Sequence, residues 1–178
     1  MATELEDLKV LKNLELIADD IWNKVNHWNA FARDTVGKQL TRAVDSVGAN
    51  IAESYGRFHF GDKINFLYYA RGSLFETKYW INRSAARNLV SKQQAETLAT
   101  QLTQIARQLN HFAKSLKRQK QTSKTTMREP APVYLVEFEF NEALFSDSDL
   151  TWLLALNSIE LPQSPVSSLQ SLQDNNHD

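Results

Sequence analysis

The fold is decided by residues 91–116, which read SKQQAETLATQLTQIARQLNHFAKSL. Ser91 and Gln94 have the spacing of a capping box, in which each side chain satisfies a free backbone N–H of the other residue. Beyond the box, apolar residues recur at alternating intervals of three and four, at Ala95, Leu98, Leu102, Ile105, Leu109, Phe112 and Leu116. This period is typical of a helix in a left-handed bundle. Small residues that allow close helix contact repeat beside this seam, at Ala99, Ala106 and Ala113.

Two further helical patterns lie near the start of the chain. Residues 5–28 carry apolar side chains every three or four positions, which predicts a first helix. Residues 29–37 read as a loop that ends in a helix cap at Asp34 or Thr35. The second helix carries an apolar seam at Leu40, Val44, Val47, Ile51 and Tyr55.

Two glycines mark positions of interest in this second helix. Gly56 can adopt the left-handed conformation that ends helices, so we expect the helix to stop there. Gly48 lies in the helix interior, where glycine costs about 1 kcal/mol relative to alanine. A close helix contact or a bend at Gly48 would explain its presence.

The third helix, residues 61–88, is apolar on more than one side. One seam consists of Ile64, Leu67, Leu74 and Ile81. Large aromatic side chains are spread around the rest of the helix, at Phe66, Tyr68, Tyr69, Phe75, Tyr79 and Trp80. A helix of this kind needs two buried faces. We therefore expect the second face to be covered by another subunit, which makes the protein a homo-oligomer.

Four helices with short connections pack most simply in up-down-up-down order. The sequence therefore predicts an all-α protein, with an antiparallel four-helix bundle at 1–120, a linker at 121–132 and an irregular acidic extension at 133–178. Within the extension, 133–140 alternates like a short strand, 146–149 can cap a brief helix over 150–156, and 162–178 has the composition of a disordered tail.

The distribution of charge separates the two parts of the chain. Residues 1–120 carry 18 Lys and Arg against 12 Asp and Glu, whereas residues 121–178 carry 2 against 9. A basic body favours an anionic partner. The sequence has no secretory signal and no apolar run close to the roughly 20 residues that span a bilayer, so we expect a cytoplasmic protein with no membrane partner.

Several kinds of chemistry have no basis in this sequence. It contains no cysteine, which excludes disulfides, thiolate metal sites and a cysteine nucleophile. No Gly-x-Ser-x-Gly elbow, phosphate-binding glycine loop or Rossmann fingerprint occurs. The four histidines, His27, His59, His111 and His177, lack metal-ligand spacing. We therefore expect no enzyme activity, no cofactor and no metal.

Three stretches resemble a known family. They are residues 39–44 (QLTRAV), 50–57 (NIAESYGR) and 66–76 (FLYYARGSLFE), and at this separation they are similar to the 23S ribosomal RNA intervening-sequence proteins. The resemblance covers roughly residues 5–118. Ser54 departs from the usual glycine of the family, and Gly48 stands where proline is common.

The resemblance implies an antiparallel four-helix bundle that assembles into a homopentamer. Intervening-sequence members have no established biochemical activity. The related accessory proteins of diversity-generating retroelements look like binding partners of nucleic acid and of a reverse transcriptase. The resemblance therefore implies an adaptor that binds structured RNA or DNA, or a nucleoprotein complex that contains a reverse transcriptase.

Polar residues of the resembling stretches form one candidate site. Two interpretations are open: a pocket for a polar ligand, or an interhelical network that fixes helix register, which we favour because these residues follow a packing seam. Arg71 should be partly buried and should need a carboxylate partner, for which we propose Glu53. The set is Asn50, Glu53, Arg57, Arg71 and Glu76.

A basic stripe on the fourth helix forms a second candidate site. Its members stand at i, i+4, i+7 and i+11, away from the apolar seam, and lysines extend it. One interpretation is contact with the backbone of RNA or DNA, because no base-reading motif is present. The other is a solvated face with a basic helix end. The proposed contact residues are Arg107, His111, Lys114, Lys117, Arg118 and Lys120.

Three roles are open for the extension: a docking element for a partner, a cover that folds back and masks the basic bundle, or no role. For the whole protein, the first hypothesis is a non-enzymatic oligomeric adaptor for structured RNA. The second is a protein-binding scaffold without a nucleic-acid role. Salt dependence discriminates between them, because each phosphate contact steepens the loss of affinity with salt.

Overall fold

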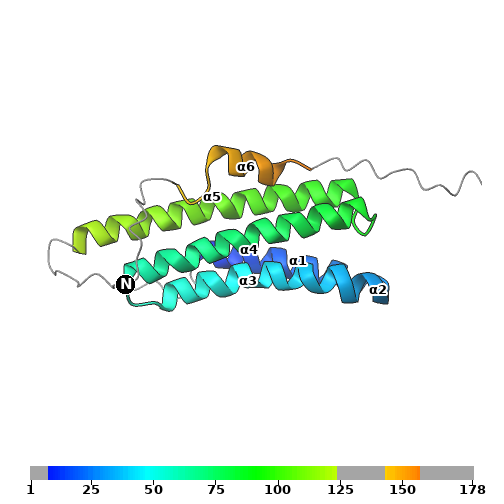
Figure 1. The fold of residues 1–178 in the computed structure, drawn as a ribbon, viewed down its shortest axis with the longest axis horizontal. Coiled ribbons are helices and arrows are strands. Elements are labelled where there is room, and N and C mark those ends of the chain that lie inside the picture. The colour runs from blue at the N-terminus through cyan, green and yellow to red at the C-terminus, as the bar shows by residue number, and fades with distance from the viewer. Residues whose placement is uncertain (1–7, 124–142, 157–178) are drawn as a thin grey trace, which may run out of the picture.

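The structure, a computed structural model, describes residues 8–123 and 143–156, and the regular elements in these ranges are helices. They are α1 (Lys9–Asn26), α2 (Ala30–Ala32), the π-helical turn η2 (Arg33–Gly37), α3 (Lys38–Gly56), α4 (Phe60–Ala86), α5 (Lys92–Ser123) and α6 (Asp147–Leu154). The four long helices lie side by side, and α6 lies along α5 (Figure 1).

The four long helices close into a ring. α1 packs against α3 and α5, and α4 packs against the same two helices. Successive helices run in opposite directions, since each short connection reverses the chain (Figure 1). This arrangement confirms the predicted all-α, antiparallel four-helix bundle. In α5 the expected seam faces the core, with Phe112 partly buried and the others buried: Ala95, Leu98, Leu102, Ile105, Leu109 and Leu116.

The connection between the first two long helices differs from the prediction. Residues 30–37 are helical, not a loop, so the chain continues from α2 through η2 into α3 without a break. The cap that the sequence reading missed is Asn29, whose Oδ1 accepts a hydrogen bond from the N–H of Ala32 at 2.9 Å. The predicted caps Asp34 and Thr35 lie inside η2. Asparagine is as good a cap as aspartate, so this signal was present in the sequence.

The C-terminal ends of α3 and α4 differ in backbone conformation. α3 ends at Gly56 as predicted, but no described glycine has a positive φ, and Arg57 instead turns the chain out with an extended conformation. After α4, Asn88 takes the left-handed conformation at φ 55°. Its N–H bonds to the carbonyl of Ala85 at 3.0 Å, and the N–H of Leu89 bonds to that of Ser84 at 2.9 Å. This is a Schellman closure in which asparagine replaces glycine.

Gly48 lies where α3 faces α1, but the contact there does not require a glycine. A Cβ at this residue would lie 3.5 Å from Cδ2 of Leu14 and 3.7 Å from Cδ1 of Leu11, both on α1. These are ordinary van der Waals distances. An alanine would therefore fit at this crossing of α1 and α3, and a close helix contact does not explain the glycine.

The boundaries of the last helix and of the extension also need correction. α5 runs to Ser123, so the predicted linker 121–132 begins inside a helix, and its residues 124–132 lie outside the described part. The predicted strand 133–140 and the predicted disordered tail 162–178 lie outside it as well. The predicted short helix exists as α6, and the side chain of Ser146 caps it.

Candidate functional site

The basic stripe of α5 is an exposed surface. Arg107, His111, Lys114 and Arg118 are all exposed, as their spacing along the helix predicted. No ion pair joins Arg107, His111 or Lys114 to a carboxylate of the described residues. We call the surface of these four residues the basic face. It presents positive charge to solvent along about 16 Å of helix.

The two lysines proposed to extend the basic face behave differently. Lys117 is half-buried, and this burial lowers the pKa of its ammonium group. It therefore contributes less to the basic face than the four exposed residues. The side chain of Lys120 lies outside the described part of the chain.

The polar residues of the resembling stretches join α3 to α4 in separate groups. Asn50 donates through Nδ2 to the carbonyl of Ser46 at 2.8 Å and lies 3.4 Å from Oγ of Ser73 on α4. Glu53 forms an ion pair with Arg57, and the guanidinium of Arg57 stacks on the ring of Phe66, 4.6 Å from its centroid.

A second group lies further along the same interface. Glu76 on α4 pairs with Arg42 on α3 at 3.2 Å, and its Oε1 accepts a hydrogen bond from Nε1 of Trp80 at 3.5 Å. These contacts lie along the interface between α3 and α4. Asn50 and Glu76 thus bridge α3 and α4, whereas the ion pair of Glu53 with Arg57 lies at the end of α3.

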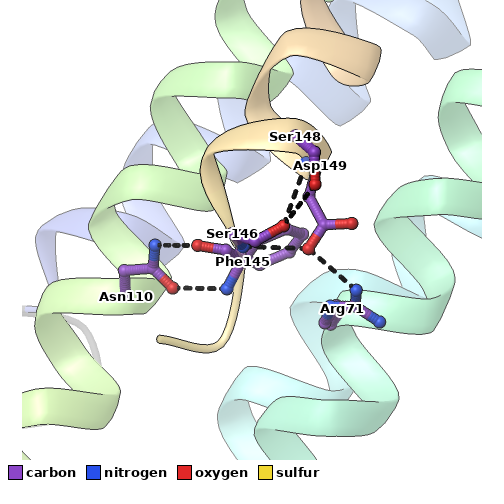
Figure 2. A network of polar contacts seen from close by, with 6 residues as sticks. All are labelled: Arg71, Asn110, Phe145, Ser146, Ser148 and Asp149. Carbon is purple, nitrogen blue, oxygen red and sulfur yellow. Dashed lines mark hydrogen bonds and ion pairs between the residues drawn. The ribbon is translucent and has the colours of Figure 1, made fainter. Parts of the chain in front are cut away.

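The predicted partner of Arg71 is wrong. Nη2 of Arg71 contacts Oδ2 of Asp149 at 2.9 Å, and Asp149 lies on α6 (Figure 2). Glu53 pairs with Arg57, the C-cap residue of its own helix α3. The prediction that Arg71 is partly buried is correct, because its side chain is 34% exposed. The carboxylate comes from the extension, for which folding back on the bundle was one of the three roles left open.

Asp149 is held by three groups at once. Partial burial tends to raise the pKa of this carboxyl, but hydrogen bonds from the backbone N–H of Ser146, from Arg71 and from the hydroxyl of Ser146 outweigh burial and lower it. The same carboxylate completes a capping box with Ser146 at the start of α6. Asp149 therefore links the local structure of α6 to its attachment on α4 (Figure 2).

Aromatic side chains bring the rest of the segment onto α4. The ring of Phe145 stacks on Phe75 at a centroid distance of 5.9 Å, and Trp152 packs on the same ring at 5.2 Å. The guanidinium of Arg71 lies over Phe75 and Phe145, at 4.7 Å and 5.5 Å from their centroids. Phe145 is 1% exposed, so this is a desolvated anchor and not a surface contact.

Asn110 of α5 holds the backbone of the segment. Its Nδ2 donates to the carbonyl of Phe145 at 2.9 Å, and its Oδ1 accepts from the N–H of Phe145 at 2.7 Å (Figure 2). A side-chain amide thus satisfies both backbone groups of one residue, as a neighbouring strand would. Asn110 lies one helical turn from Arg107 and from Lys114, so the segment lies beside the basic face.

Lys78 is completely buried under the end of α6. Its Nζ donates to Oδ1 of Asn82 at 2.9 Å and to the carbonyl of Ala155 at 2.6 Å. No carboxylate of the described residues pairs with it, and burial lowers its pKa to about 8. Ala155 caps the C-terminal end of α6, where a positive charge is favourable.

Residues 143–156, the docked segment, thus occupy a surface of α4 and α5 that we call the docking face: Arg71, Phe75, Lys78 and Asn110. This changes the interpretation of the second apolar face of α4. The chain itself covers the part around Phe75, for which the sequence had predicted contact with another subunit. The part that carries Tyr69 and Tyr79 is open, with these residues 60% and 51% exposed.

The docked segment also bears on the masking hypothesis. The acidic segment folds back on the bundle, but Arg107, His111, Lys114 and Arg118 are exposed with the segment in place. Residues 143–156 therefore do not mask the basic face.

The sequence did not predict that Lys78, Asn110 and Phe145 take part in contacts between the bundle and the extension. A signal existed for Lys78, because it lies four residues after Leu74 and three before Ile81, on the buried side of an apolar helix. Asn110 and Phe145 gave no such signal, since an amide beside an apolar helix seam and one aromatic residue in an irregular stretch are common.

Two structural features concern membranes and metals. None of the helices in 8–123 and 143–156 combines the length and apolar character needed to cross a membrane. In the same ranges, no group of three or more His, Asp or Glu side chains is placed to hold a metal ion.

Comparison with known proteins places the bundle in a family. Comparison with curated proteins gave no match. The family model described as "23S rRNA-intervening sequence protein" matches residues 6–111, which is more than half of the chain. The match spans α1 to α4 and most of α5 and ends before the docked segment. With its four-helix bundle and this match, the chain belongs to the 23S rRNA-intervening sequence protein family.

Proposed function

We propose that the protein is a non-enzymatic adaptor that binds structured RNA through the basic face of α5. The observation that carries this proposal is the exposure of Arg107, His111, Lys114 and Arg118 along one side of the helix. The family description names a ribosomal RNA, which is a structured RNA. Cations on a rigid helix suit the contact of phosphate groups, which binds RNA by backbone and shape.

The proposal includes self-association and a larger complex. The open tyrosines of α4 favour contact with further copies of the chain, and the family resemblance suggests five copies. In such an assembly the basic face repeats in each copy, so its potential adds up. A cytoplasmic location, DNA as an alternative ligand and a reverse transcriptase as part of the bound nucleoprotein stay predictions.

A protein-binding scaffold without a role in RNA binding is the second candidate. The observation that favours it is the exposed aromatic surface of α4, at Tyr69 and Tyr79, since exposed aromatic patches mark protein contacts. In that case the charge of α5 serves only to keep the helix solvated.

A salt-resolved titration tests the first candidate. A fluorescently labelled stem-loop RNA is titrated with the full chain at several salt concentrations between about 50 mM and 200 mM. Three phosphate contacts predict that log K falls with log salt at a slope of about −2 to −3 per subunit. The variant with Arg107→Gln, Lys114→Gln and Arg118→Gln should lose about tenfold or more in affinity and most of the slope.

A matched control removes the same charge elsewhere. Lys9→Gln, Lys38→Gln and Arg87→Gln replace three exposed cations outside α5. This control should bind RNA nearly as the unchanged chain does. Equal loss in both triple variants would place binding in the overall charge and not in the basic face. No binding at the lowest salt would leave the scaffold as the function.

A further inference from the structure

The contacts of the docked segment have the character of peptide recognition. The segment places the ring of Phe145 on Phe75 and the carboxylate of Asp149 on Arg71. Asn110 binds the backbone of Phe145, and Lys78 binds the carbonyl at the end of α6. The groups that meet are separated by 35 to 78 positions in sequence. None of these contacts depends on chain connectivity, so the docking face would recognise the same segment whichever chain supplied it.

The docked segment lies outside the closed bundle. The ring of α1, α3, α4 and α5 is complete without it, and the family match ends at residue 111. Removing the segment would uncover the docking face but would leave every helix–helix contact of the ring in place. The segment is therefore added to a closed ring, and its side chains Leu144, Phe145 and Leu153 extend the buried apolar core.

Part of the docking face is held at a cost. Lys78 is buried without a carboxylate partner among the described residues, and Nε of Arg71 is buried there without a hydrogen bond. Buried groups of this kind oppose docking. These costs offset part of the stabilisation that the buried Phe145 and the ion pair of Asp149 provide, which favours release and exchange of the segment.

The connection to the segment is long enough for exchange. Asn110, which holds Phe145, lies 13 residues before Ser123, a distance of about 20 Å along α5. The 19 residues from 124 to 142 can span up to about 65 Å. A chain of this length exceeds the return path by about threefold, so length alone does not confine the segment to its own bundle.

We propose that the docking face of one copy of the chain binds the 143–156 segment of a second copy. The exchange replaces each contact within the chain by the identical contact between chains. No new interface is needed, and the main difference in free energy is the entropy of association. The segment then acts as a link between subunits, independently of any RNA bound to the basic face.

Reversal of one ion pair in complementary variants tests the exchange. Variant X carries Arg71→Glu and variant Y carries Asp149→Arg. Neither variant can form the ion pair between positions 71 and 149 within one chain. Between chains, Arg71 of Y can pair with Asp149 of X, and the glutamate at position 71 of X can pair with the arginine at position 149 of Y. Because the chain has no cysteine, Ser115→Cys in X and Ala143→Cys in Y carry donor and acceptor dyes at two exposed positions.

The two variants are unfolded together, refolded and examined by energy transfer. The comparison samples are X alone and Y alone, in each of which some molecules carry the donor dye and the others carry the acceptor dye. Exchange predicts that X–Y pairs exceed statistical mixing by about fivefold or more. Statistical mixing overturns the proposal, because subunits that associate only through other surfaces do not distinguish X from Y. A matched control uses an ion pair between two helices of the bundle. One variant carries Arg42→Glu, the other carries Glu76→Arg, and the two should mix statistically.

A labelled peptide of residues 143–156 covers the case in which a variant folds poorly. Full-length Asp149→Arg, whose own segment is weakened, should bind this peptide saturably. The chain that also carries Arg71→Glu, or a peptide with Phe145→Ala, should bind about tenfold more weakly. Absence of saturable binding overturns the proposal. Peptide binding combined with statistical mixing assigns the segment to its own chain and overturns it as well.

Discussion

At the scale of single residues, Lys78 is a buried cation that pairs with no carboxylate of the described residues. Its ammonium group is fully buried and is held by two neutral oxygens, those of Asn82 and Ala155. A neutral partner stabilises a charge less than a carboxylate does, so the proton is bound more weakly. The pKa of about 8 follows from this burial.

The free energy of unfolding should therefore depend on pH through Lys78. The unfolded chain binds this proton up to the usual lysine pKa of 10.5, whereas the folded chain releases it at about 8. Between these values the unfolded state holds more protons, so stability rises with pH, by about 1–3 kcal/mol in total.

Urea unfolding from about pH 7 to pH 10 measures this effect. The unchanged chain should gain stability relative to Lys78→Met as pH rises, because the variant lacks the titrating group. Lys38→Met, at an exposed lysine, is the control and should follow the unchanged chain. Parallel curves for the unchanged chain and Lys78→Met would contradict the assignment.

At the scale of elements, capping boxes begin two helices that occupy different positions in the fold, one in the core and one outside the ring. Ser91 and Gln94 begin α5, which forms one wall of the core. Ser146 and Asp149 begin α6, which lies on the outside of the ring. The same hydrogen bonds should therefore stabilise the whole fold in one place and only the docked segment in the other.

We expect Ser91→Ala and Ser146→Ala to differ in what they destabilise. Each loses a cap worth about 1 kcal/mol. Ser91→Ala should lower the global free energy of unfolding by that amount. Ser146→Ala should leave the bundle unchanged but should speed amide hydrogen exchange in α6 about fivefold, since the segment opens locally. If Ser146→Ala lowered the global midpoint as much as Ser91→Ala, the segment would be part of the cooperative core.

At the scale of the whole molecule, one side of α4 is unpartnered in the described structure. Tyr69 and Tyr79 are exposed there, while the neighbouring part of the helix is covered by the docked segment. An apolar patch of this kind on a helix favours association between copies. Self-association through α4 is thus a prediction about the remaining open surface.

Light scattering of the full chain should give a mass above that of the 20.4 kDa monomer at micromolar concentration. Tyr69→Arg with Tyr79→Arg should lower the mass, because the added charges would be buried at the contact. Phe31→Arg changes another exposed aromatic residue, on α2 at one end of the bundle (Figure 1). This control should assemble normally. A monomeric unchanged chain would contradict the prediction.

Much of this molecule follows from local pattern. The apolar spacing in residues 91–116 predicted α5 and its buried side, because the helical repeat alone determines which residues share a face. The cap at Ser146 was equally readable. The basic face was predicted as a stripe and is exposed as expected, since polar residues opposite an apolar seam have no other place to lie.

The sequence by itself thus determined the four helices, their order and the charge of α5, which depend on residues close together in the chain. Tertiary structure alone decided that Arg71 pairs with Asp149, that Asn110 clamps Phe145 and that Lys78 is buried. Those partners are 35 to 78 positions apart. No periodicity encodes a meeting over that distance, because it requires both the closed bundle and the returning segment.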